Sequence, residues 1–298
     1  MPSITSIETL QTILRERNYI ADRGLATSIY LAYKLNRPLF LEGEAGVGKT
    51  EVAKMMADIL DTDLIRLQCY EGLDVHHAVY EWNYTRQMMN IRLMEVRGER
   101  PSESDLFSRD YLLRRPLLQA IEHSHDKPVV LLVDEVDRSD EEFEAFLLEV
   151  LSDFQITIPE IGTIQAAHKP FVVITSNRTR EVHDALKRRC LYFWIDYPTF
   201  EKELEIVRAK IPEAAGQLSR QITGFIQELR RTDLYKIPGV AETLDWTTAL
   251  VALDQRALDP AIVEETLGVI LKYQDDVEKI QGEQVKAILD RVQVESSG

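Results

Sequence analysis

Cysteine is scarce in this sequence, which has only Cys69 and Cys190 among 298 residues. Each stands beside an apolar stretch, so buried, reduced thiols are expected rather than a disulfide framework or a metal-binding pair. No run of 18 apolar residues occurs, and residues 1–10 lack the basic and apolar blocks of a secretory signal. These absences argue against a disulfide-built secreted domain and a helical membrane protein, and a soluble cytoplasmic protein is expected.

Positive charge is also in deficit. The chain has 35 Lys and Arg against 50 Asp and Glu, which gives a formal net charge of -15 at pH 7. A general affinity for DNA, RNA or an anionic membrane needs a cationic surface, so these partners are disfavoured, although a local basic stripe would escape this argument. The length of 298 residues suits two domains of ordinary size.

Short apolar runs alternate with helical patterns in the first two thirds of the chain. Strands are expected at 38–41, 63–69, 128–134, 170–175 and 190–195, and the helices between them include 51–60 and 140–151. This alternation predicts an α/β fold in which helices cover both faces of a five-stranded parallel sheet. The continuously apolar residues 129–133 are typical of a strand that is buried on both sides.

Two segments interrupt this alternation. Residues 71–116 form an insert that is rich in aromatic and charged residues. In 154–166, apolar and polar residues alternate on both sides of a turn, which predicts a β-hairpin. The pattern after Pro198 is helical to the end. We therefore predict an α/β domain over 1–197 and an α-helical domain over 198–298.

The strongest motif lies between the first predicted strand and the helix that follows it. Residues 43–50 read Gly-Glu-Ala-Gly-Val-Gly-Lys-Thr and fit the pattern G-x-x-x-x-G-K-[ST] of a phosphate-binding loop. Glycines let backbone N–H groups approach a phosphate chain, Lys49 adds a positive charge, and the Thr50 hydroxyl suits Mg²⁺. The positive end of the following helix faces the same anion. With ATP and Mg²⁺ as cofactors, the predicted binding residues are Gly43, Glu44, Ala45, Gly46, Val47, Gly48, Lys49, Thr50 and Glu51.

A pair of carboxylates follows the third predicted strand. Asp134 and Glu135 stand at its carboxyl end, which is the edge where open α/β sheets bind ligands. Together with the phosphate loop they resemble the two halves of an ATPase site, in which Asp134 holds Mg²⁺ with Thr50 and Glu135 polarises the attacking water. The alternative is an acidic, solvated entry to a helix.

Polar and basic residues after the next strand complete this pattern. Asn177 follows the fourth predicted strand and is placed to bond the water or a phosphate, although an asparagine that caps a turn would look the same. Arg188 and Arg189 close a short helix before the fifth strand, where an arginine can reach the nucleotide of a neighbouring subunit. The alternative for both arginines is a solvated basic helix end. We favour Arg189 over Arg188.

The order of phosphate loop, acidic pair, strand-end asparagine, arginine and helical tail resembles that of the AAA+ ATPases, over essentially the whole chain. The insert and the hairpin are similar to those of the MoxR group within that superfamily. Residues 68–74 (QCYEGLD), 80–84 (YEWNY) and 237–246 (IPGVAETLDW) resemble ATPases that accompany the maturation of carbon monoxide dehydrogenase. The resemblance implies a P-loop AAA+ domain with a helical lid, and a hexameric chaperone whose partners are a von Willebrand factor A-domain protein and a molybdenum hydroxylase client.

One stretch departs from the family. Its lid often offers the nucleotide an arginine within a Ser-Pro-Arg sequence, whereas here the matching residues are Ala241, Glu242 and Thr243. Hydrolysis is therefore expected to be slow or to depend on Arg188, Arg189 or Arg138 of a neighbouring subunit. This keeps a second hypothesis open, a nucleotide-gated scaffold with little turnover. A nucleic-acid motor is a third and weaker one, because the chain is acidic.

The insert also carries an aromatic row. Tyr80, Trp82 and Tyr84 share one face if the segment is extended, and such a row suits contact with a client chain or a partner. Packing of these rings against their own domain is the equally weighted alternative.

Overall fold

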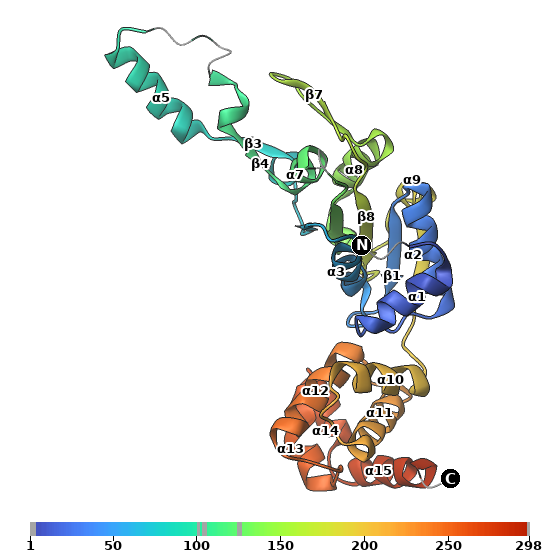
Figure 1. The fold of residues 1–298 in the computed structure, drawn as a ribbon. Helices are drawn as coiled ribbons and strands as arrows, with labels where there is room; N and C mark the ends of the chain where they lie inside the picture. Colours follow the sequence, from blue (N-terminus) through green and yellow to red (C-terminus); the bar gives the residue numbers. More distant parts are fainter. Residues whose placement is uncertain (1–3, 100–101, 103–105, 124–126, 297–298) are drawn as a thin grey trace. The chain divides into compact units, whose positions relative to one another are not determined.

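The computed structural model describes residues 4–99, 102, 106–123 and 127–296 (Figure 1), and the chain divides into two compact units. The first, here the sheet unit, comprises 4–7, 24–42 and 50–194. The second, here the helical unit, comprises 8–23, 43–49 and 195–296. The predicted domain boundary at 197 lies close to the start of the last of these segments, and it stays a prediction.

A five-stranded sheet organises the sheet unit, with the strand order β2-β5-β8-β1-β9. The pairs β2–β5, β5–β8 and β1–β8 are parallel, which confirms the predicted α/β fold class. Every residue of β1, β5 and β8 is buried, as continuous apolar strands require. The strands are β1 (Leu39–Gly43), β2 (Leu64–Gln68), β5 (Val130–Asp134), β8 (Phe171–Ser176) and β9 (Leu191–Ile195).

Helices of the sheet unit bury their apolar faces in the same core as the strands. Leu117 and Leu118 of α7 and Phe143 and Leu147 of α8 belong to one cluster with residues of β5. Asp140 begins α8, because its side chain accepts a hydrogen bond from the N–H of Phe143 at 2.9 Å. The helices are α2 (Arg23–Leu35), α3 (Lys49–Leu60), α7 (Pro116–Glu122), α8 (Glu141–Asp153) and α9 (Asp184–Arg189).

The insert folds around a two-stranded ribbon, in which β3 and β4 pair antiparallel. The side chain of Asn83 caps α5, so the extended segment ends at Trp82 and Tyr84 is already helical. Trp82 is buried edge-to-face against Phe107, and Tyr84 is exposed. The three rings therefore do not form one row. The elements are α4 (Val75–Ala78), β3 (Tyr80–Trp82), α5 (Tyr84–Val96), the 3-10 turn η1 (Arg109–Tyr111) and β4 (Leu112–Arg114).

A second ribbon follows α8. Its strands β6 (Gln155–Ile158) and β7 (Gly162–Gln165) pair antiparallel, as the alternation in 154–166 predicts. Between β5 and α8 the chain forms a short 3-10 turn, η3 (Val136–Arg138).

The helical unit packs around Trp246, which is fully buried beside Phe225. Helices α11, α12, α13 and α15 contribute most of this apolar cluster. The helices are α1 (Ile7–Glu16), α10 (Phe200–Lys210), α11 (Gly216–Arg230), α12 (Val240–Ala252), α13 (Pro260–Ile270), α14 (Gln274–Ile280) and α15 (Glu283–Ser296). Within the described residues, no helix of either unit is long and apolar enough to cross a membrane.

Candidate nucleotide site

The predicted phosphate loop connects β1 to α3. Gly46 has φ +77°, in the left-handed region that side chains disfavour. A Cβ on Gly43 would lie 2.2 Å from the carbonyl oxygen of Ile195, so only glycine allows this close approach of two backbones. Both features explain why the pattern requires glycine here. At the glycines, no side chain stands between the backbone N–H groups and a phosphate.

Lys49 is the first residue of α3 and is buried. Its ammonium donates hydrogen bonds to the carbonyl oxygens of Gly43 at 2.8 Å and Glu44 at 2.6 Å. The positive charge is thus held at the loop itself. A phosphate bound there would find a cation already in place, so the loop fits the group that the sequence predicts.

The loop also contacts the start of α12 within the helical unit. The N–H of Ala241 donates to the carbonyl oxygen of Gly46 at 3.1 Å. The carboxylate of Glu242 accepts from the N–H of Gly239 at 2.9 Å, and the buried Thr243 donates to Glu203 at 2.7 Å. The residues that stand in place of a lid arginine are therefore engaged in fixing the start of α12.

Asp134, at the end of β5, is the centre of a polar cluster in the sheet unit. The hydroxyls of Thr50 and Thr175 donate to its Oδ1 at 3.1 and 2.5 Å. The guanidinium of Arg66 bonds its Oδ2 at 2.5 Å. The structure thus brings together the two residues predicted to hold Mg²⁺, a hydroxyl and a carboxylate, which are oxygen donors of the kind that this ion prefers.

Glu135 follows in a left-handed conformation, with φ 55°. Its N–H donates to Oγ1 of Thr175 at 2.9 Å. Its carboxylate accepts three hydrogen bonds, from Gln68 at 3.1 Å, Arg138 at 3.2 Å and Asn177 at 3.3 Å. The strained backbone aims this carboxylate away from the strand and toward the ends of its neighbours.

Asn177 follows β8, and its side chain contacts Glu135 rather than capping a helix. Its position is set by the buried carboxylate of Asp137, which accepts from the N–H of Asn177 at 3.1 Å and from the N–H of Thr179 at 2.8 Å. The side chain and the backbone of this asparagine thus join the loop after β8 to the acidic pair.

Arg188 and Arg189 lie at the exposed end of α9. Arg37 donates to the carbonyl oxygens of both and of Cys190, which fixes this helix end. Arg189 donates to the carbonyl oxygen of Leu148 at 3.3 Å. Within the described residues, neither arginine is bonded to Asp134 or Glu135, so a role for them at this cluster would need a second subunit.

Four residues of the candidate site were not predicted from the sequence. Arg66, Gln68, Thr175 and Asp137 all contact the predicted site residues directly. The available signal was their place in the chain, because Gln68 and Thr175 stand at the carboxyl ends of strands that meet Asp134 at one sheet edge.

Cys69 lies next to this cluster, and its N–H donates to the carbonyl oxygen of Asp134 at 2.9 Å. Burial, followed by the negative charge of Asp134, raises the pKa of its thiol from 9.0 to about 12. Cys190 is also a free, buried thiol, as the sequence predicts.

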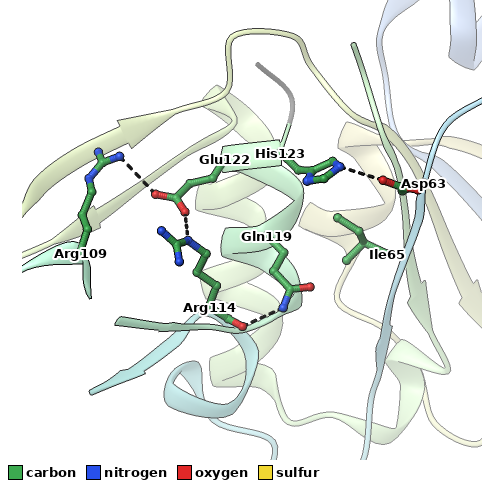
Figure 2. A pocket seen from close by; sticks show the side chains of 7 residues that line it. All are labelled: Asp63, Ile65, Arg109, Arg114, Gln119, Glu122 and His123. Carbon is green, nitrogen blue, oxygen red and sulfur yellow. Dashed lines mark hydrogen bonds and ion pairs between the residues drawn. The ribbon is translucent and has the colours of Figure 1, made fainter. Parts of the chain in front are cut away.

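A separate cavity of about 520 Å³ opens in the sheet unit (Figure 2). Two arginines that line it flank Glu122 of α7, whose carboxylate lies 2.5 Å from Arg114 and 3.5 Å from Arg109. His123 pairs with Asp63 on another side. None of the predicted site residues lines this cavity.

Comparisons with known proteins show the family of this chain. Residues 38–190, more than half of the chain, match the family model of the AAA domain of the dynein-related subfamily. This segment runs from β1 to the end of α9 and contains the phosphate loop, the acidic pair, Asn177 and both arginines. The chain belongs to this AAA family.

Individual relatives are more distant. Uncharacterized proteins of Staphylococcus aureus, from strains bovine RF122 / ET3-1 and USA300, are 24% identical over 205 residues, which is 66% of this chain and 70% of theirs. A mutant of RuvB from Thermotoga maritima is 18% identical, with a TM-score of 0.48 over 91% of this chain and 72% of that one.

Proposed function

We propose that this protein binds ATP with Mg²⁺ and hydrolyses it. The observation that carries the proposal is the hydrogen bond between Thr50, the last residue of the phosphate-loop motif, and Asp134, 84 residues away at the end of β5. A hydroxyl and a carboxylate in contact at the carboxyl edge of a parallel sheet offer the oxygen ligands that Mg²⁺ takes beside a phosphate chain.

Each residue then has a task in the proposed reaction. The N–H groups of 44–48 and the ammonium of Lys49 bind the phosphates, and Thr50 and Asp134 hold Mg²⁺, with Glu51 beside them in α3. Bound Mg²⁺ supplies charge neutralisation for phosphoryl transfer. Glu135 accepts the proton of the attacking water, and Asn177 orients it. Arg189, or Arg188, reaches the nucleotide of a neighbouring subunit. This role requires a ring of subunits, and we propose a ring of six.

We further propose that hydrolysis remodels a protein client, as in a MoxR-type chaperone. Support comes from the resemblance of 68–74, 80–84 and 237–246 to ATPases of carbon monoxide dehydrogenase maturation. On this proposal the partner is a von Willebrand factor A-domain protein, and the client is a molybdenum-containing enzyme.

A nucleotide-gated scaffold with little turnover is the second candidate. Two observations favour it: three donors hold Glu135 in place, and Thr243, where the family often has an arginine, is buried against Glu203. Such a protein would bind ATP tightly and release phosphate slowly.

Calorimetric titration with ATP and Mg²⁺, together with phosphate release by Glu135→Gln, separates these candidates. Loss of the proton acceptor is expected to lower turnover by about 10²–10⁴-fold while ATP still binds. Glu142→Gln, on an exposed residue of α8, is the matched control and should turn over normally. Wild-type turnover no faster than that of Glu135→Gln would favour the scaffold, and no heat upon addition of ATP would overturn both.

Capture of client proteins tests the finer proposal. The Glu135→Gln protein, loaded with ATP and used as bait in its native cells, is expected to enrich a subunit of a molybdenum enzyme. Recovery of unrelated proteins alone would contradict that assignment and leave the ATPase proposal untouched.

A further inference from the structure

Arg66 is an exposed residue on an edge strand, yet it pairs with a buried carboxylate of the candidate site, Asp134. It belongs to β2, which pairs with one strand, β5, among the residues that the structure describes. Its side chain is 54% exposed, whereas that of Asp134 is 5% exposed. One guanidinium nitrogen bonds both Oδ2 of Asp134 at 2.5 Å and Oε1 of Gln68 at 2.6 Å.

We propose that Arg66 is a positioning residue. Its guanidinium neutralises Asp134 in place of the metal ion, and it must leave this carboxylate when Mg²⁺ binds with a nucleotide. This inference rests on the proposed function and deepens it, because it assigns control of the Mg²⁺ requirement to a residue outside the phosphate loop and the acidic pair.

The charge of Asp134 needs a partner. A buried carboxylate is costly unless hydrogen bonds and an opposite charge compensate it. Two hydroxyls, from Thr50 and Thr175, satisfy Oδ1 of Asp134, but both are neutral. Within the described residues, Arg66 is the cation that is paired with Asp134.

Arg66 and a metal ion at Asp134 would repel each other. A divalent cation close to Asp134 would stand within a few ångströms of the guanidinium, and like charges at such distances repel strongly in a partly buried site. Because the Arg66 side chain is more than half exposed, it can move into water at small cost, whereas Asp134 cannot. Binding of the metal therefore competes with the arginine for one carboxylate.

Gln68 links Arg66 and Asp134 to Glu135, the other carboxylate of the acidic pair. The amide of Gln68 accepts from Arg66 through Oε1 and donates to Glu135 through Nε2, at 3.1 Å. Departure of Arg66 removes the bond that orients this amide. Occupancy of the metal position is thereby coupled to the hydrogen bonding of Glu135, the proposed proton acceptor.

The test is a Mg²⁺ titration of nucleotide affinity, which requires no turnover. Calorimetry measures the binding of ADP first in EDTA and then at increasing Mg²⁺, in wild type and in Arg66→Gln, Arg66→Lys and Arg92→Gln. The last variant removes the same charge from an exposed position on α5 and is the matched control. Thermal unfolding verifies that each variant is folded.

Because Arg66→Gln loses the competing charge, the Mg²⁺ concentration at half effect is expected to fall by about tenfold. The free energy of a tenfold change is of the same order as that of one charge-assisted hydrogen bond. Arg66→Lys keeps the charge without the planar fork and should fall between Arg66→Gln and wild type. ADP affinity in EDTA should be unchanged in all variants, and Arg92→Gln should match wild type throughout.

An unchanged Mg²⁺ midpoint in Arg66→Gln, with ADP binding intact, overturns this inference and leaves the proposed function standing. A weaker Mg²⁺ response in Arg66→Gln overturns it as well, because the arginine would then assist the metal. Failure of wild type to bind ADP or ATP under any condition contradicts the proposed function itself.

Discussion

Two buried carboxylates, one in each unit of the molecule, are paired with arginines in very different ways. In the sheet unit, Asp134 is bonded by an arginine that is 54% exposed. In the helical unit, Glu203 is fully buried and receives a two-pronged contact from Arg230, itself only 7% exposed, with both N···O distances 2.7 Å. Gln227 and Thr243 also donate to Glu203 at 2.7 Å.

This difference separates a structural ion pair from an exchangeable one. Arg230 is fixed by further contacts, since it donates to the carbonyl oxygen of Pro238 at 2.9 Å and lies over the ring of Tyr197. Arg66 has no comparable enclosure, because more than half of its side chain meets water. A buried, fully bonded pair holds helices together, while an exposed partner can be replaced by another cation.

The largest effect is expected in the helical unit. Arg230→Ala leaves the charge of Glu203 buried without its partner and should lower the free energy of unfolding by about 3–5 kcal/mol. Urea-induced unfolding followed by circular dichroism measures it. Arg231→Ala removes the next arginine, which is 71% exposed and pairs with Glu228, and should cost less than about 1 kcal/mol. Equal losses for the two variants would break the distinction between enclosed and exposed pairs.

Alkaline pH should act on the sheet unit through its thiols. Burial raises the pKa of both Cys69 and Cys190 from 9.0 to about 12. Because these folded-state values exceed the unfolded one, the stabilisation is fully present below pH 9 and is lost as the pH rises toward 12. In that range the free energy of unfolding should fall by up to about 1.4 kcal/mol per pH unit for each thiol.

Urea midpoints of wild type and of Cys69→Ala with Cys190→Ala, measured from pH 8 to pH 10, test this expectation. The double variant should show the shallower decline. Tyr192 and Tyr197, whose pKa values are raised from 10.0 to about 12, act mainly at higher pH and are common to both proteins. Parallel declines would show that the thiols ionise as readily in the fold as in the unfolded chain.

Helix caps offer a pair in which the two units should behave alike. Asp140 begins α8 by bonding the N–H of Phe143 at 2.9 Å, and Asp259 begins α13 by bonding the N–H groups of Ala261 and Ile262 at 2.9 and 3.0 Å. Replacement of either aspartate by alanine should cost about 1 kcal/mol, and asparagine should restore most of it. Chemical denaturation of the four variants gives both comparisons, and a cost confined to one unit would contradict a purely local effect.

The smallest change in stability is expected at Arg66. Arg66→Ala should alter the free energy of unfolding by less than about 1 kcal/mol, because the exposed side chain gains little from its pair and its removal opens Oδ2 of Asp134 to water, which then solvates the charge. The same urea experiment measures it. A loss as large as that of Arg230→Ala would place the arginine among the structural residues and weaken its proposed exchange with Mg²⁺.

Much of the candidate site was accessible from the sequence. Thr50, Asp134, Glu135 and Asn177, each predicted from its place after a strand or within the loop motif, are joined by hydrogen bonds directly or through Thr175. Arg188 and Arg189 are not bonded to this cluster, and their roles stay predictions. Of the two equally weighted alternatives for the aromatic rings, the single row is excluded, because Asn83 starts a helix and ends the extended geometry at Trp82.

Local patterns in this sequence were enough to predict the parallel sheet, the hairpin and the glycine-dependent loop. The apolar periodicity of a strand and the need for glycine at a positive φ both show within a few consecutive residues. The pairing of Arg66 with Asp134, 68 residues apart, and of Arg230 with Glu203 depended on tertiary structure. Strand order and helix packing decide which side chains meet, and no short stretch of sequence encodes that β2 lies beside β5.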